Sequence, residues 1–308
     1  MYEVTLFGIE MTLNPVALTI PLGNSEWKVY WYGILIALGF LGALLYGMKN
    51  ARRFDIDPDR LIDVILITTP LAILCARCYY LIFDGVKLQS FKDFFGFGDS
   101  SGFAGLAIYG GVLGALVIGG LLCLWRKIPL LAAFDLTAVG FLIGQSVGRW
   151  GNFMNQEAYG TFTGSTFWGM ESNRTIAEMG PGLVHPCFLY ESLWCILGFL
   201  LLHYLSKRKK FHGQLVLTYG VWYGCGRAVI ELLRTDSLML GKIRVSCLLS
   251  VLAALGCAVA LYLLLRRHKD TALNEQYESV FAEQTEEEPA QEVEEIIPME
   301  EEEYVQEN

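Results

Sequence analysis

The stretch that decides the fold is LLAAFDLTAVGFLIGQSVGRWGNFMNQEAYG, residues 130–160. Its first 18 residues form a largely apolar run that is long enough to be most of a membrane helix. Four polar residues then follow within nine positions: Arg149, Asn152, Asn155 and Glu157. Such groups are costly where a chain leaves hydrocarbon, unless they face the protein interior or water. The pattern predicts either a headgroup site at the outer mouth of a helix bundle or a membrane-interface loop with a snorkelling arginine.

The rest of the chain is equally apolar. Of its 308 residues 54% are apolar, and the mean hydropathy of +0.41 is too high for an ordinary soluble domain. We therefore predict an all-α integral membrane protein with about seven transmembrane helices. The expected spans are 31–47, 61–83, 104–125, 130–147, 186–205, 214–233 and 243–265.

Charge asymmetry predicts how these spans are oriented. One side of the expected bundle carries 13 Lys and Arg residues and the other side carries eight. The more basic side is expected to be cytoplasmic, which places the amino end outside and the carboxyl end inside. The polar motifs around Arg149, His185 and Arg234 then gather at the outer face.

The ends of the chain differ from the seven-helix domain expected over 31–268. Residues 1–30 alternate in character, and we expect short extended pieces or an interfacial, extracytoplasmic arm. A second extracytoplasmic section, 149–185, separates the fourth and fifth spans. Residues 277–308 hold 13 of the 32 acidic residues and no Lys or Arg, so the tail 269–308 is predicted to be disordered and cytoplasmic.

The sixth expected span carries a charged stripe. Tyr223, Arg227, Glu231 and Arg234 lie at offsets that share one face of a helix. A charged stripe inside a span is expected to face the bundle interior. Arg227 and Glu231 then form either an internal ion pair or an anion site, since the planar fork of arginine suits phosphate.

Two further spans carry polar or small residues in suggestive positions. His185 precedes Pro186 at the start of the fifth span, and Tyr190 and Glu191 lie just inside it. His185 is either a base or a capping residue. In the third span, Gly110 and Gly114 are four residues apart and predict close helix packing, with Tyr109 beside them as a possible donor to a ligand oxygen.

Several kinds of site are absent from the sequence pattern. The sequence has no cluster of metal ligands, no phosphate-binding glycine loop before a helix and no nucleophile elbow. Cys75 and Cys78 have C-x-x-C spacing, but they lie inside an expected span and are interpreted as packing residues. No metal and no cofactor is expected, and the polar residues together favour a site for an anionic lipid headgroup.

Six motifs, in order, resemble those of the bacterial prolipoprotein diacylglyceryl transferase family. The most specific is Gly148-Arg149-x-Gly151-Asn152-Phe153-x-Asn155-x-Glu157-x-x-Gly160. The others are Trp31-Tyr32-Gly33, Ala76-Arg77-x-Tyr79-Tyr80, Tyr109-Gly110-Gly111-x-Leu113-Gly114, His185-Pro186-x-x-Leu189-Tyr190-Glu191 and Tyr223-Gly224-x-x-Arg227-x-x-x-Glu231-x-x-Arg234. The resemblance covers about residues 27–265.

The resemblance implies a seven-span enzyme of the bacterial plasma membrane that needs no cofactor. It would move the diacylglyceryl group of phosphatidylglycerol onto the thiol of the lipobox cysteine of a preprolipoprotein, and glycerol phosphate would leave. The implied partners are phosphatidylglycerol, preprolipoprotein lipobox peptides and the lipid bilayer, with no nucleic acid. The implied catalytic residues are Arg149, Arg227, Tyr109, His185 and Glu231. The implied substrate-binding residues are Arg149, Asn152, Asn155, Glu157, Gly160, Tyr32, Tyr190 and Arg234.

Three positions depart from the family pattern: Cys187 and Cys247 stand where Thr or Gln would be expected, and the third is Tyr109. Some members have a histidine, proposed as the base, where this chain has Tyr109. A tyrosine with a pKa of about 10 is a poor base at neutral pH. The base here is then His185, Glu231, or no single residue, with the thiolate favoured by electrostatics alone.

Two other classes of function compete with the enzyme. A transporter or anion channel predicts internal repeats and broken helices at the bilayer midplane, and we find no clear repeat. A receptor that only binds phosphatidylglycerol predicts the same arginines, but lipid binding without turnover.

Overall fold

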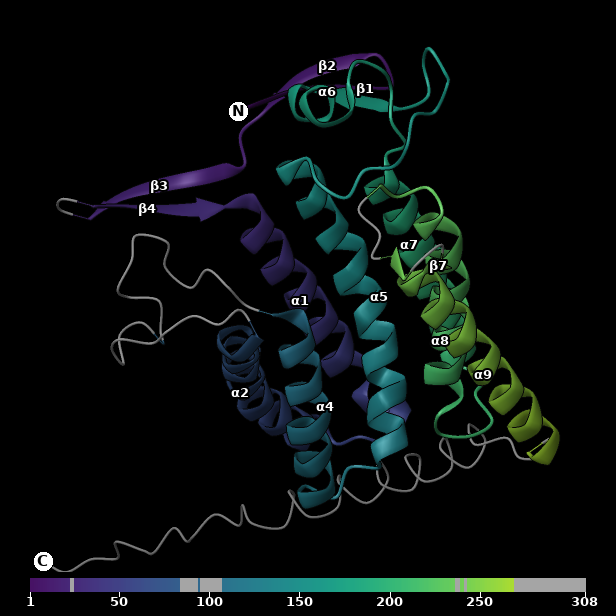
Figure 1. The fold of residues 1–308 in the computed structure, drawn as a ribbon. Helices are drawn as coiled ribbons and strands as arrows, with labels where there is room; N and C mark the ends of the chain where they lie inside the picture. Colours follow the sequence, from purple (N-terminus) through teal and green to yellow (C-terminus); the bar gives the residue numbers. More distant parts are fainter. Residues whose placement is uncertain (23–24, 84–93, 95–106, 236–238, 241–242, 269–308) are drawn as a thin grey trace, which may run out of the picture.

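Seven helices of 18 residues or longer make up most of the computed structural model, which describes residues 1–22, 25–83, 94, 107–235, 239–240 and 243–268 (Figure 1). They are α1 (Trp31–Asn50), α2 (Pro58–Phe83), α4 (Ile108–Trp125), α5 (Leu130–Asn155), α7 (Cys187–Ser206), α8 (Gln214–Glu231) and α9 (Val245–Arg267). Five of them are long and apolar enough to cross a membrane: α1 with its extension η1 (Ala51–Phe54), α2, α5, α7 and α9. The mostly helical membrane fold predicted from the sequence is thus confirmed.

The predicted helix boundaries are close to those observed, with one informative difference. The fourth span was expected to end at 147, but α5 continues through Asn155. Gln156 then adopts a left-handed conformation, with φ of 52°, and its N–H bonds to the carbonyl oxygen of Phe153. The polar motif is therefore the last two turns of a helix, which places Arg149, Asn152 and Asn155 at fixed helical offsets. The predicted residues 104–106 of the third span, and the acidic tail, lie outside the described residues.

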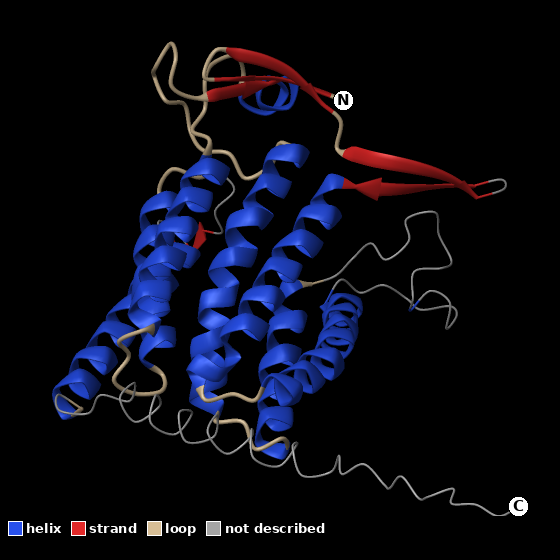
Figure 2. Cartoon of the chain, turned by 180° about the vertical axis from the view of Figure 1, so that it is seen from behind, coloured by secondary structure: helices blue, strands red, loops and turns tan. Residues whose placement is uncertain are grey.

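The strands of residues 1–30 and 170–172 lie at one end of the bundle (Figures 1 and 2), whereas a short antiparallel pair, β6 (Met239–Leu240) with β7 (Ile243–Arg244), lies between α8 and α9 in the chain. β1 (Tyr2–Leu6) pairs antiparallel with β2 (Ile9–Leu13) and, on its other side, with β5 (Met170–Ser172). A hairpin of β3 (Val16–Leu22) and β4 (Ser25–Tyr30) extends sideways from the start of α1. The extended pieces expected in residues 1–30 are confirmed, but the pairing of β1 with β5 across the sequence was not predicted.

The three-stranded sheet is fastened to the bundle by a small apolar cluster. Val4 of β1 and Met170 of β5 are almost fully buried against aromatic residues at the adjoining ends of α5 and α7, Phe153 and Phe188. The two phenylalanine rings stack with centroids 4.5 Å apart. The short helix α6 (Asn173–Met179) follows β5 and begins with a capping box between Ser172 and Thr175. This assembly covers the end of the bundle that holds the polar motif.

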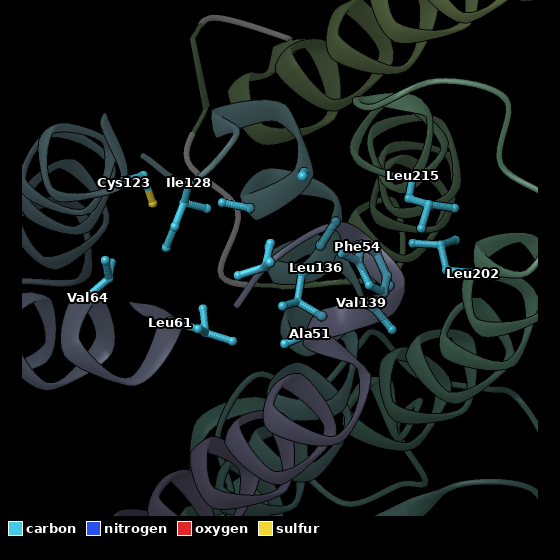
Figure 3. Close-up of a cluster of buried hydrophobic side chains, with 14 of the residues drawn as sticks. Ala51, Phe54, Leu61, Val64, Cys123, Ile128, Leu136, Val139, Leu202 and Leu215 are labelled. Atoms are coloured by element: carbon cyan, nitrogen blue, oxygen red, sulfur yellow. The ribbon is translucent and has the colours of Figure 1, made fainter. Parts of the chain in front are cut away.

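The opposite end of the bundle has its own core. Figure 3 shows buried apolar side chains that converge there from η1, α2, α4, α5, α7 and α8, among them Phe54, Leu136 and Leu215. Asp135 of α5 is fully buried beside this core. Its carboxylate accepts hydrogen bonds from the N–H groups of Gly213, at 2.8 Å, and Leu215, at 2.9 Å. These are N–H groups that the first turn of α8 leaves without helical partners, so Asp135 ties α8 to α5.

Helices α2 and α4 pack closely because glycines remove side chains between them. A Cβ atom on Gly110 would lie 2.5 Å from the Cys75 carbonyl oxygen, and one on Gly114 would lie 2.6 Å from the Cys75 Cβ. The predicted small-residue packing surface is confirmed, and so is the interpretation of Cys75 as a packing residue. All eight cysteines are free thiols.

Candidate functional site

The centre of the polar site is a carboxylate, Glu191, that the motifs contain but to which sequence reasoning assigned no role. Glu191 lies in the second turn of α7, and its side chain is only 4% exposed. Its two oxygens lie 2.5 Å from an Arg149 guanidinium nitrogen, 2.9 Å from one of Arg227 and 3.4 Å from one of Arg234. One acidic residue on α7 thus holds together arginines from α5, from α8 and from the segment after α8. An acidic residue inside an apolar span was the available signal.

A second buried carboxylate completes the arginine network. Glu231 is 2% exposed and its Oε2 lies 2.6 Å from Arg227, so of the two alternatives for these residues the ion pair is the one observed. Arg227 therefore bridges the carboxylates of Glu191 and Glu231. Arg244, just before α9, donates to the backbone carbonyl groups of Glu231 and Arg234, the latter at 3.0 Å. The side chains on the predicted stripe do face the interior of the bundle.

An amide and carboxylate chain continues this network along the end of α5. Arg149 donates to the Asn152 side-chain oxygen at 3.3 Å, and the Asn152 amide donates to Glu157 at 2.9 Å. The Asn155 amide lies 3.5 Å from the same Glu157 oxygen. Asn152 and Asn155 share a helix face as expected, and the left-handed turn at Gln156 brings Glu157 back toward them.

Two glycines of the motif allow close approach at this end. A Cβ atom on Gly151 would lie 2.6 Å from the ring of Tyr32, so the first turn of α1 packs directly on α5. Gly160 donates its N–H to the His185 carbonyl oxygen at 2.9 Å. A Cβ there would lie 2.7 Å from the His185 Cβ and 2.9 Å from the Cys187 sulfur. Tyr32 and Gly160 are therefore placed beside the network as the motifs predicted.

His185 and Tyr190 meet beside Glu191. The Nδ1 atom of His185 lies 3.2 Å from the Tyr190 hydroxyl, and the Trp168 indole donates to the same hydroxyl at 2.7 Å. Trp168 also stacks on Tyr190, and its other side contacts Phe7 in the turn between β1 and β2. Trp168 is a second residue that sequence reasoning misses, because its place depends on the loop before β5 and not on a motif.

Tyr109 is placed differently from the other predicted site residues. It lies at the start of α4, is 70% exposed, and contacts the ring of Tyr79 on α2. Figure 1 shows that α4 begins further down the bundle than the ends of α5 and α8 that carry the arginines. The structure gathers the other predicted site residues at one end and leaves Tyr109 beside α2.

The network has a net charge that constrains its ligand. Among the residues that the structure describes, four arginines and three glutamates take part: Arg149, Arg227, Arg234 and Arg244 with Glu157, Glu191 and Glu231. These seven side chains carry an excess of one positive charge, in a largely buried setting where electrostatic interactions are strong. No group of three or more His, Cys, Asp and Glu residues suited to a metal ion occurs within the described ranges. The arrangement can bind a singly charged anion with several donors at once.

Comparison with known proteins bears on this site. The sequence profile of the family described as prolipoprotein diacylglyceryl transferase matches residues 15–263. A protein of Limosilactobacillus reuteri (strain DSM 20016), named phosphatidylglycerol–prolipoprotein diacylglyceryl transferase, is 38% identical over 270 residues, which cover 85% of this chain and 94% of that protein. Proteins of the same name from Pediococcus pentosaceus and Clostridioides difficile (strain 630) are 42% and 36% identical, over 79% and 80% of this chain and 87% and 95% of theirs.

Proposed function

The chain belongs to the prolipoprotein diacylglyceryl transferase family, and we propose how its residues carry out the reaction for which its relatives are named. The protein is a transferase that moves the diacylglyceryl group of phosphatidylglycerol to the cysteine thiol of a prolipoprotein, the first step of lipoprotein maturation. The bond between the diacylglyceryl carbon and the phosphate oxygen breaks, and a carbon–sulfur bond forms. The thiol loses its proton, and glycerol phosphate leaves with the electron pair of the broken bond.

The observation that carries the mechanism is the Glu191-centred arginine network. The phosphodiester of phosphatidylglycerol carries one negative charge, and the network has an excess of one positive charge. We assign Arg149 and Arg227 to the phosphate oxygens, because the departing phosphate gains charge as the bond breaks and fixed donors stabilise that charge. Glu191 holds both guanidinium groups in place, since it contacts them at 2.5 Å and 2.9 Å.

The chain of side chains at the end of α5 suits the glycerol headgroup. Asn152, Asn155 and Glu157 offer both donors and acceptors, and hydroxyl groups need both. Arg234 adds a cation on the far side of Glu191, and Tyr32 and Gly160 line the approach. This assignment is the same as the one that the motif resemblance implied.

For the thiol proton we assign His185 as the base. Glu231 is already engaged, because its Oε2 lies 2.6 Å from Arg227 and its side chain is almost fully buried. His185 points Nδ1 at the Tyr190 oxygen, which leaves Nε2 for the thiol. With the proton of His185 on Nδ1, the Tyr190 oxygen accepts from both His185 and Trp168, and its own O–H remains for substrate. The nearby arginines also favour the thiolate.

We further propose the membrane arrangement that the charge pattern predicts. The seven long helices are all transmembrane, with the amino end and the polar network outside and the carboxyl end inside the bacterial plasma membrane. The end of the bundle opposite the network carries most Lys and Arg residues, which supports this orientation. A reporter enzyme that is active only outside the cytoplasm, fused after residue 308, is expected to be inactive in cells. An active reporter would reverse the orientation.

A transfer assay tests the proposed function. Purified protein in detergent receives phosphatidylglycerol and a lipobox peptide, and the mass gain of the peptide is followed for wild type, Arg149→Ala and the control Arg60→Ala. Arg60 pairs with Asp57 at 3.4 Å on the exposed surface at the start of α2. Diacylglyceryl transfer is expected from wild type and the control, and a loss of about 100-fold or more from Arg149→Ala. Full activity of a well-folded Arg149→Ala protein would remove the anion-site assignment, and lipid binding without transfer by wild type would overturn the function.

A further inference from the structure

Helices α7 and α8 are joined by a reciprocal pair of tryptophans. The Trp194 indole donates to the Trp222 carbonyl oxygen at 2.9 Å, and the Trp222 indole donates to the Trp194 carbonyl oxygen, also at 2.9 Å. The two rings stack with centroids 4.3 Å apart and planes 15° from parallel. Each tryptophan is therefore both donor and acceptor, and the two antiparallel helices meet in a locally two-fold arrangement.

Each indole also packs against a glycine of the opposite helix, where the missing side chain leaves a gap that we call a notch. A Cβ on Gly226 of α8 would lie 2.1 Å from the Trp194 Nε1, and one on Gly198 of α7 would lie 2.5 Å from the Trp222 Nε1. Both glycines follow a tryptophan by four residues, so the pattern Trp-x-x-x-Gly occurs once on each helix. We call these four residues the tryptophan interlock. Sliding α7 along α8 breaks both hydrogen bonds and drives both indoles into backbone.

The tryptophan interlock lies directly beside the arginine network. Trp194 follows Glu191 by three residues, so both side chains lie on the same face of α7 one turn apart. Gly226, which receives the Trp194 ring, immediately precedes Arg227 on α8. The distance of 2.9 Å between Glu191 and Arg227 thus depends on the relative register of α7 and α8.

We propose that the tryptophan interlock is a positioning device for the reaction, setting where Glu191 stands relative to Arg227 and Arg234. This inference rests on the proposed function of the arginine network. Lipid tails are as apolar as leucine, so hydrophobic burial alone does not fix how two helices slide against each other in a bilayer. The two directional hydrogen bonds, and the packing of each indole against a glycine of the other helix, do fix the relative position of α7 and α8. A misplacement of about 1 Å in such a site costs about 100-fold in rate.

The test uses glycine substitutions with a matched control. Gly226→Ala and Gly198→Ala fill the two notches, whereas Gly256→Ala adds the same methyl group to α9 where nothing lies within 4 Å. We expect kcat of diacylglyceryl transfer to fall at least about tenfold for each notch variant, with KM for phosphatidylglycerol changed less than about threefold. The control is expected to keep wild-type kcat. Near-ultraviolet circular dichroism is expected to lose the signal of the stacked indoles in the notch variants alone.

A double-mutant cycle separates positioning from general destabilisation. If the tryptophan interlock acts by placing Glu191, then Gly226→Ala costs less than about threefold when added to Glu191→Gln, whose residual transfer is followed by mass spectrometry over long incubations. The same factor in both backgrounds would overturn the inference, and so would wild-type kcat in Gly226→Ala. If Gly226→Ala does not fold, Trp222→Phe, which keeps a ring but lacks the N–H donor, enters the same cycle with the same criteria. Absence of transfer by wild type would instead refute the proposed function.

Discussion

Replacing Glu191 with glutamine removes the charge at the centre of the network while keeping its shape. The carboxylate contacts three arginines at 2.5, 2.9 and 3.4 Å, and it is almost fully buried. Loss of one partner from a buried ion pair costs about 3–5 kcal/mol, because the remaining charges stay desolvated. Glu191→Gln is therefore expected to lower the melting temperature in detergent and to release the three guanidinium groups from their fixed directions.

The expected kinetic effect is a fall in kcat without loss of lipid affinity. Losing preorganised donors to a developing oxyanion costs about 100- to 1000-fold in kcat. The net charge of the network rises by one unit, so binding of the anionic lipid in the ground state is not weakened, and KM for phosphatidylglycerol is expected to stay the same or fall. Steady-state transfer assays with varied phosphatidylglycerol measure both constants.

A second glutamate provides the control. Glu178 on α6 also pairs with an arginine, Arg174, at 2.8 Å, but on the exposed surface. That hydrogen bond, with a weaker one from Tyr159, lowers the pKa of Glu178 below its usual value, so the control also removes a real negative charge. Glu178→Gln is expected to keep kcat within about threefold. If Glu191→Gln kept kcat as well as Glu178→Gln does, or raised KM while kcat stayed unchanged, the conclusion that Glu191 organises the catalytic arginines would be refuted.

Three further changes test other parts of the structure. Gly160→Ala places a methyl group 2.7 Å from the His185 Cβ, so the rate of transfer is expected to fall at least about tenfold. The control Gly148→Ala adds a methyl group with nothing within 4 Å and is expected to keep the wild-type rate. Equal rates for the two variants would refute the packing argument. Tyr109→Phe is expected to retain kcat within about threefold, because Tyr109 is exposed beside α2; a larger loss would return it to the catalytic residues. Burial lowers the pKa of Lys209, in the loop between α7 and α8, so the unfolded chain binds this proton more tightly than the folded protein. Thermal stability of wild type relative to Lys209→Met is therefore expected to rise as the pH approaches 10.5, the ordinary pKa of lysine, and a difference that falls or stays constant would contradict the burial of Lys209 as a cation.

The sequence predicted the helices better than it predicted their ends. Apolar runs located all seven long helices, five of which are long and apolar enough to cross a membrane. The fourth span was ended too early, because Arg149 was interpreted as the point where the chain leaves hydrocarbon. In the structure the helix continues, since the polar side chains have partners within the protein and need no water.

The candidate site was predicted in its residue types but not in its connections. Arginine, asparagine and glutamate residues in apolar segments indicated a polar binding site. The motifs contained most of the residues that the structure brings together. Glu191 was passed over because its importance comes from contacts with three residues on other elements, which helix periodicity cannot show. The pairing of β1 with β5 and the contact of Trp168 with Tyr190 were missed for the same reason.

The distribution of the arginine network over separate helices constrains how the protein is made. Synthesis proceeds from the amino end, so Arg149 on α5 enters the membrane before Glu191 on α7 has been translated, and Glu191 arrives before Arg227 on α8. Each charge is costly at that depth until its partners are present. By contrast, α2 and α4 pack mainly on each other and carry none of the charges of the network. Assembly of the network is therefore expected to be sequential, with a late step in which α8 joins α5 and α7 and Arg227 pairs with Glu191.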